Sequence, residues 1–141
     1  MTEHKAAAGS DTAKWERTQP RLEGFKKARG TVVFYEDAAT VREFQDKFPA
    51  LKEVFPEWSV QSGGMHQFVL WTALEAEGLG ANLQHYQIVK SVSEKAAEMF
   101  GIPKDWDMAA QLVFGGIEEG GRPMEPKEKK STSETVKVFS S

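Results

Sequence analysis

The residues best suited to chemistry form a short run, Leu83, Gln84, His85 and Tyr86. This run places an amide, an imidazole and a phenol at the end of an apolar, strand-like segment, where side chains can point into a cleft. Ordinary strand alternation is an equal alternative, with Gln84 and Tyr86 on one face and His85 on the other. The run therefore predicts a polar cleft edge without naming a reaction.

Two further groups each allow a functional and a structural interpretation. The basic cluster Lys127, Lys129 and Lys130 could hold a phosphate, or it could be a solvated charge run. Gly63 and Gly64 fall inside a predicted helix, where each costs about 1 kcal/mol relative to Ala. Either the helix begins only at Met65, or a cofactor ring or second subunit approaches the backbone closely.

Several common sites can be rejected. Residues 78–83, Gly-Leu-Gly-Ala-Asn-Leu, begin like a dinucleotide fingerprint but lie between a predicted helix and a predicted strand, in the wrong order for one. The sequence has no Gly-Lys-Ser/Thr phosphate loop and no Gly-x-Ser-x-Gly elbow. Its three histidines include no close pair, and it has no Cys, which excludes disulfides, thiolate zinc sites and a cysteine nucleophile. We predict no metal site and no catalytic acid/base pair.

Composition limits the partners. The 141 residues include 18 Lys and Arg against 21 Asp and Glu, a net charge of −3. A dedicated nucleic-acid binder normally carries a basic face, so we expect no nucleic-acid partner. The longest apolar stretch, residues 68–74, is interrupted by Thr72 and is far shorter than the roughly 20 residues of a membrane span. We expect no membrane association and a cytoplasmic location, which could extend to the nucleus.

The first half of the chain predicts a leader, a strand and several helices. Residues 1–12 lack periodicity and suggest a disordered leader, and residues 13–29 suggest a helix with Pro20 in its first turn. Residues 31–35 are β-branched and aromatic, typical of a strand buried on both faces. Asp37 is a candidate N-cap for a helix over 38–48. A long helix over 58–77 is apolar nearly all round at 68–74, which predicts burial on most sides.

The second half alternates strands with one helix. We predict strands at 81–86 and 108–114, and between them a helix capped by Ser91 or Ser93 and ended by Gly101. Residues 115–134 form a predicted extended connector to a last strand at 135–139, which needs a partner sheet, for which another subunit is a candidate. This order indicates an α+β domain over residues 13–141.

Longer motifs then become recognisable. Residues 62–67 read Ser-Gly-Gly-Met-His-Gln, and residues 71–86 read Trp-Thr-Ala-Leu-Glu-Ala-Glu-Gly-Leu-Gly-Ala-Asn-Leu-Gln-His-Tyr. They closely resemble the nitroreductase-like FMN flavoprotein family, in the branch that carries the Leu-Gln-His-Tyr strand. The same resemblance extends over most of the chain from about Trp15, through residues 30–37, 48–49, 55–59, 110–115 and 136–139.

The resemblance implies a fold, a cofactor and a partner. Family members are FMN-binding homodimers with an antiparallel or mixed sheet flanked by helices around a long central helix, and a C-terminal strand exchanged between subunits. They reduce nitro compounds, quinones or related small-molecule acceptors with NAD(P)H through the flavin, so no catalytic side chain is required. By position, Leu83, Gln84, His85 and Tyr86 would lie against the flavin ring, and Lys130 near its phosphate. The helix with Gly63 and Gly64 would form the subunit interface.

The sequence also departs from the family pattern. Family members normally begin with additional helices that carry an Arg segment for the FMN phosphate and a Ser/Asn segment near the ring, and we expect this chain to start too late to contain them. Each lost charge-assisted contact is worth roughly 1.5–3 kcal/mol. The alternative function is therefore a catalytically impaired, N-terminally truncated relative that acts as a dimerisation or regulatory partner, for example of a full-length paralogue.

Overall fold

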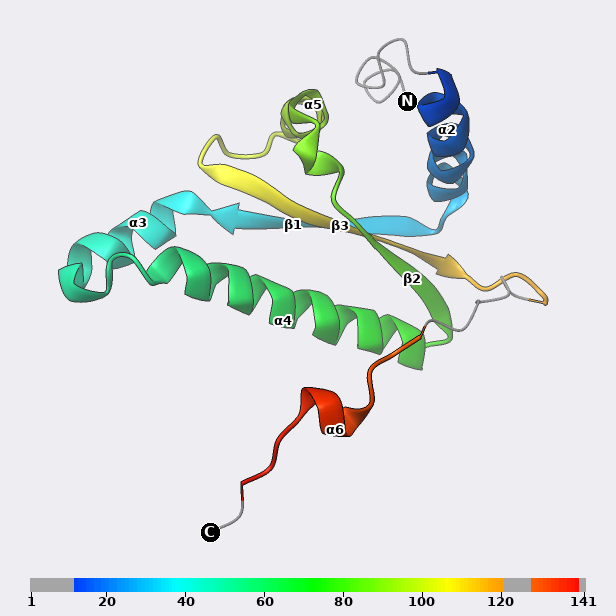
Figure 1. Ribbon diagram of the computed structural model, residues 1–141. Helices are drawn as coiled ribbons and strands as arrows, with labels where there is room; N and C mark the ends of the chain where they lie inside the picture. The colour runs from blue at the N-terminus through cyan, green and yellow to red at the C-terminus, as the bar shows by residue number, and fades with distance from the viewer. Residues whose placement is uncertain (1–11, 121–127, 140–141) are drawn as a thin grey trace.

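In a computed structural model, residues 12–120 and 128–139 are described, and they form one antiparallel sheet with helices on both faces (Figure 1). Lys127 and all but the last residue of the predicted leader, residues 1–12, lie outside the described residues. Along the chain the elements are α2 (Thr12–Lys27), β1 (Gly30–Asp37), α3 (Ala38–Lys47), η1 (Pro49–Leu51), α4 (Phe55–Ala76), β2 (Leu79–Gln84), η2 (Tyr86–Ile88), α5 (Lys90–Phe100), β3 (Trp106–Gly116) and α6 (Thr132–Thr135). The α+β fold class is confirmed.

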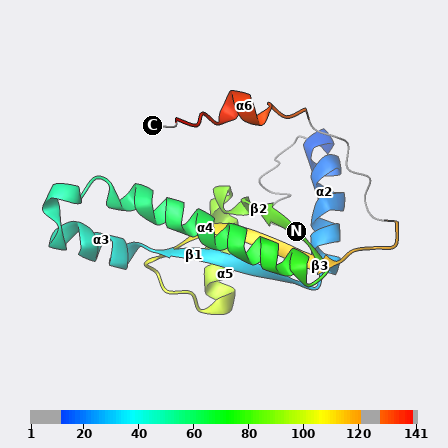
Figure 2. The ribbon, with the colours of Figure 1, turned by 90° about the horizontal axis from the view of Figure 1, so that it is seen from below.

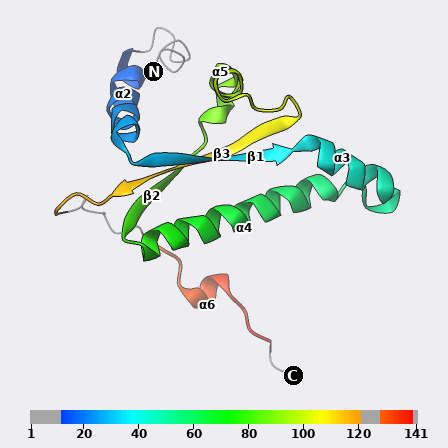
Figure 3. The ribbon, with the colours of Figure 1, turned by 180° about the vertical axis from the view of Figure 1, so that it is seen from behind.

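The last strand of the sheet, β3, is its centre. The strand order is β1-β3-β2, and β3 pairs with both neighbours in antiparallel fashion. Ala110 and Leu112 on β3 are fully buried and Val113 nearly so. The apolar core is therefore small and lies along one strand, with α4 on one face of the sheet and α2 and α5 on the other (Figure 3).

A β-bulge interrupts the pairing of β1 with β3. Phe34 faces Ala110 across the ladder, whereas the next residue, Tyr35, faces Met108, so Ala109 has no partner on β1. Phe34 and Tyr35 are neighbours on β1, so their side chains point to opposite faces of the sheet. Their partners Ala110 and Met108 therefore also point to opposite faces, although they are two residues apart on β3. The bulge lies immediately beside the end of β2, which stops at the pair Gln84 and Gln111.

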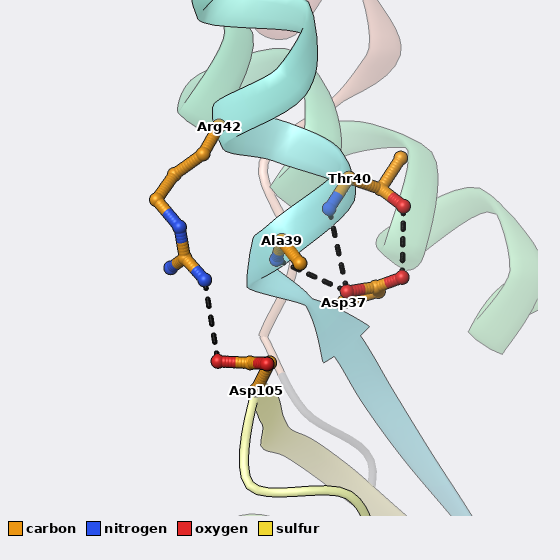
Figure 4. Close-up of polar contacts among 5 residues, drawn as sticks. All are labelled: Asp37, Ala39, Thr40, Arg42 and Asp105. Atoms are coloured by element: carbon orange, nitrogen blue, oxygen red, sulfur yellow. Dashed lines mark hydrogen bonds and ion pairs between the residues drawn. The ribbon is translucent and has the colours of Figure 1, made fainter.

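The predicted N-cap of α3 is confirmed. Asp37 Oδ1 accepts hydrogen bonds from the backbone N–H groups of Ala39 at 3.0 Å and Thr40 at 3.3 Å, and Oδ2 accepts from the Thr40 hydroxyl at 2.8 Å (Figure 4). The Thr40 hydroxyl and the two N–H donors lower the pKa of the Asp37 carboxyl. Arg42 on the same helix pairs with Asp105 at 3.3 Å, which ties α3 to the loop before β3.

Two local predictions are wrong. Pro20 lies in the interior of α2 and not in its first turn, and the helix continues through it at the cost of one backbone hydrogen bond. Neither Ser91 nor Ser93 caps α5, because the N-cap is Val89 and the Ser93 hydroxyl donates to the Lys90 carbonyl instead. The predicted end of α5 is confirmed, since Gly101 has the left-handed φ of 64° that favours glycine.

The long helix α4 begins earlier than predicted, and it is less covered. Pro56 stands in its first turn, so α4 starts at Phe55 and not at Trp58. Gly63 and Gly64 lie inside it, which excludes a helix start at Met65. Burial on most sides is wrong for the single chain: α4 packs one side against the sheet (Figure 2), whereas Phe68 is 69% exposed on the other. A one-layer sheet can cover only one side of a helix.

The C-terminal segment forms no strand in the single chain. Thr135 ends the short helix α6, whose Ser131 and Glu134 form a capping box, and Val136 is extended. Neither sheet edge pairs with the described residues 128–139. Val138 and Phe139 are almost fully exposed. The predicted strand at 135–139 is therefore absent here, because a strand needs a neighbour to hydrogen-bond.

Candidate functional site

The end of β2 gathers the four predicted cleft residues at one corner. Leu83 and Gln84 are the last residues of the strand, and His85, with φ −131° and ψ 50°, turns the chain into η2, which begins at Tyr86. The expected strand through Tyr86 thus ends two residues early. We call residues 83–87 the β2 corner.

Buried amides organise the β2 corner. Gln84 and Gln111 are each only 9% exposed, and no buried side-chain nitrogen or oxygen within the described residues lacks a partner. Gln84 Nε2 donates to the Leu83 carbonyl at 2.9 Å and to the Asn82 side chain. Gln111 Oε1 accepts the Tyr86 backbone N–H at 2.9 Å. This side-chain contact replaces the ladder bond that β2 loses when it leaves the sheet.

His85 and Tyr86 present different groups. The His85 ring is exposed, and its Nδ1 lies 3.4 Å from the Ala109 carbonyl oxygen and 3.3 Å from Gln87 Nε2. The Tyr86 ring packs edge-on against Phe25 of α2, with centroids 6.2 Å apart. The imidazole is therefore the side chain of the β2 corner that a ligand can reach most directly.

Sequence reasoning missed Gln87 and Gln111 as members of this corner. Gln87 Nε2 donates to the Ala109 carbonyl, and Gln111 Nε2 donates to Gln87 Oε1 at 3.2 Å. One signal was present in the sequence: Gln111 is the single polar residue in the apolar stretch from Met108 to Phe114. A polar side chain in the centre of a buried strand requires a partner.

Lys130 is not part of the β2 corner in the single chain. It lies in the exposed segment before α6, and it makes no hydrogen bond or ion pair within the part of the chain that the structure describes. Lys127 falls outside that part. A phosphate-holding role for this cluster stays a prediction.

Two grooves flank the sheet, and His85 lines neither. One, of about 430 Å³, runs between the end of α2 and the β2–β3 pair and includes Phe25, Lys27 and Asn82. The other, of about 400 Å³, lies between α3 and α4 and has aromatic walls that include Phe44 and Trp58. Both are open, and neither is a closed ligand cavity.

Comparison with known proteins decides the family. The model of the Nitroreductase family matches residues 1–116. The chain belongs to the nitroreductase family. Among curated proteins of Saccharomyces cerevisiae, it is 42% identical over 90 residues to nitroreductase FRM2 and 40% identical over 89 residues to the putative nitroreductase HBN1. These matches take in 63% of this chain and 44% of each relative, so the chain spans less than half the length of either.

Solved nitroreductases share the fold. Nitroreductase CinD from Lactococcus lactis, in complex with nicotinic acid, superimposes with a TM-score of 0.82 at 38% identity, covering 98% of this chain and 66% of CinD. A nitroreductase from Saccharomyces cerevisiae gives a TM-score of 0.61 at 39% identity, covering 72% of this chain and 55% of that one. The resemblance found in the sequence is thereby confirmed at the level of family and fold.

Proposed function

We propose that this chain supplies the β2-corner side of an FMN site in a nitroreductase-type oxidoreductase. The observation that carries the proposal is the β2 corner itself, where an exposed imidazole and a turned backbone end a strand of the family's sheet. CinD, of which 66% is covered by this chain, has been solved with nicotinic acid, chloramphenicol and 4-nitrophenol, all small aromatic molecules. A similar corner in this chain would face a flat aromatic group.

The described residues fit one part of FMN. An isoalloxazine edge carries several hydrogen-bonding atoms, and the β2 corner offers the exposed imidazole of His85, with the amide of Gln87 beside its Nδ1. Leu83 would add an apolar contact. The phosphate requires fixed cations, and Lys130 is not brought to the corner. We therefore propose that Leu83, Gln84, His85 and Tyr86 hold the ring and that Lys130 approaches the phosphate only when a second subunit is bound.

In this proposal the chain positions the cofactor, and the cofactor carries out the reaction. When bound, FMN supplies hydride transfer between NAD(P)H and an acceptor such as a nitro compound or a quinone. The task of the β2 corner is to orient the ring edge, through donors and acceptors already fixed by their own hydrogen bonds. No side chain of this chain is assigned a proton-transfer role.

A titration tests the proposal directly. FMN fluorescence should be quenched when the purified chain is added, and NADH or NADPH should then be consumed with 4-nitrophenol as acceptor. His85→Ala should weaken FMN binding by about 3- to 10-fold, the worth of one hydrogen bond. Lys104→Ala, at an exposed position in the turn before β3, is the control. The absence of binding at high micromolar FMN would refute the proposal for this chain.

The exposed side of α4 favours a second candidate, a dimerisation or regulatory partner. Val60, Met65, Phe68 and Val69 are each more than 60% exposed on that helix. A run of this kind on one helix is typical of a covered surface. This candidate predicts a homodimer, or a heterodimer with a full-length paralogue, that forms without FMN. A chain that stays monomeric at all concentrations and captures no paralogue would exclude it.

A further inference from the structure

Gln111 uses both ends of its buried amide to hold the β2 corner. Its Oε1 accepts the Tyr86 N–H at 2.9 Å, and its Nε2 donates to Gln87 Oε1 at 3.2 Å. One side chain on the central strand thus fixes the backbone of one corner residue and the side chain of the next. A buried amide with both ends satisfied is held in one orientation.

The bulge at Ala109 completes the arrangement. Ala109 has no Cα partner on β1, and β2 has already ended beside it. The Ala109 carbonyl accepts from Gln87 Nε2 and lies 3.4 Å from His85 Nδ1. Bulges commonly redirect groups next to functional sites. Here the bulge places one acceptor within reach of both Gln87 Nε2 and His85 Nδ1.

We infer that Gln111 is a positioning residue for His85, acting through Gln87. Gln111 engages Gln87 Oε1 and so turns Gln87 Nε2 toward His85, where it lies 3.3 Å from Nδ1. The Nε2 amino group has two hydrogens, one for the Ala109 carbonyl and one for Nδ1. We call this series of contacts, from Gln111 through Gln87 to His85, the relay. Its importance for flavin binding rests on the proposed function, whereas the existence of the relay does not.

The relay fixes which ring nitrogen of His85 carries the proton. The two contacts of Nδ1 require opposite ring forms, because the Ala109 carbonyl can only accept and the amino group of Gln87 can only donate. The Ala109 carbonyl already accepts from Gln87 Nε2, and the contact of Gln87 with Nδ1 is the shorter one, at 3.3 Å against 3.4 Å. Nδ1 therefore accepts from Gln87 in this inference, and the proton of the neutral ring is on Nε2. The ring nitrogen directed away from Gln87 is then a hydrogen-bond donor. A ligand with an acceptor atom, such as a ring nitrogen or carbonyl of a flavin, would find the donor already oriented.

Nuclear magnetic resonance of the FMN-free chain tests the relay. In the ¹⁵N-labelled wild type with a neutral His85 ring, the ring nitrogens should report the Nε2–H form alone. Gln111→Met should shift these ring signals toward a mixture of both forms and speed exchange of the Tyr86 amide by about 3- to 10-fold, the worth of one hydrogen bond. A wild-type ring in the Nδ1–H form, or ring signals that Gln111→Met leaves unchanged, would overturn the inference.

Two further variants separate positioning from stability. Val113→Thr alters a buried residue on the face of β3 that also carries Gln111, and it should leave the ring signals of His85 unchanged. Gln87 lies at a half-buried position, so the Gln87→Met variant should fold even if the Gln111→Met variant does not. Gln87→Met should move the His85 signals while leaving the Tyr86 amide protected, and unchanged His85 signals would again overturn the relay.

A flavin titration then distinguishes the two levels of proposal. If the wild type binds FMN, Gln111→Met should raise the dissociation constant by about 3- to 10-fold, whereas Val113→Thr should not. An equal loss in both variants would refute a positioning role in binding. If the wild type binds no FMN, the proposed function fails, and the ring signals still decide whether the relay exists.

Discussion

The β2 corner and the outer side of α4 lie on the same small domain but are completed in opposite ways. At the corner, Gln84, Gln87 and Gln111 satisfy their amides within the chain. On α4, large apolar side chains such as Phe68 have nothing over them within the described residues. The described residues thus complete the polar contacts of the β2 corner but leave one side of the longest helix uncovered.

The strand that supports both regions should be the most sensitive place in the domain. Leu112 is fully buried on β3 between them. Leu112→Ala should cost about 2–5 kcal/mol of unfolding free energy, a large part of the stability of a small domain. Urea unfolding followed by circular dichroism measures the loss. A cost below about 1 kcal/mol would mean that the two regions do not share one core.

A charge on α4 tests whether that side is covered in solution. Phe68→Glu should weaken self-association by at least about 10-fold and leave the fold intact, because it buries a charge only when a second chain docks. Sedimentation velocity over a range of concentrations measures the effect. Phe100→Glu is the matched control, since Phe100 is 70% exposed, against 69% for Phe68, on a helix at the opposite face of the sheet. Equal effects of both changes would break the comparison.

Gly64 provides a second test of whether the exposed side of α4 is covered in solution. It lies on the stripe of α4 that carries Val60 and Phe68, and a Cβ built on it meets nothing within 4 Å in the single chain. Gly64→Ala should therefore raise the stability of the isolated chain by about 1 kcal/mol. It should also weaken a dimer in which a partner backbone approaches closely. Gly24→Ala on α2, equally open, should stabilise without any change in association, and the two thermal and sedimentation profiles can be compared directly.

The smallest effect is expected at the cap of α3, which belongs to neither region. Asp37→Ala should lower the Tm by about 2–5 °C at pH 7, and Asp37→Asn by less, because Asn still caps. The pKa of Asp37 is lowered in the folded chain, so its ionised form contributes stability above its ordinary pKa of 3.8. That contribution is lost as the pH falls from 3.8 through the lower folded value. Thermal melts of the wild type and Asp37→Asn should converge there, and a constant gap would contradict the cap.

The features that could be predicted from the sequence are those that depend on residues close to one another along the chain. Asp37 and Gly101 act at helix ends through their own short-range geometry, and both were identified. The burial of α4 on most sides and the strand at 135–139 both require contacts with residues far away in the sequence, and the described residues do not make those contacts. Gln111 was missed for a related reason: its partners, Tyr86 and Gln87, are more than twenty residues away in sequence. Only the tertiary fold brings them together.

The extra residue at Ala109 has a consequence for how this strand can change over evolution. Because it offsets the side chains before it by one position, its deletion would exchange inside and outside for the stretch from Trp106 to Met108. Trp106 would then turn away from Tyr35, whose ring it contacts with centroids 6.1 Å apart. A point substitution at this position changes one side chain, whereas a one-codon loss would turn three side chains to the opposite face.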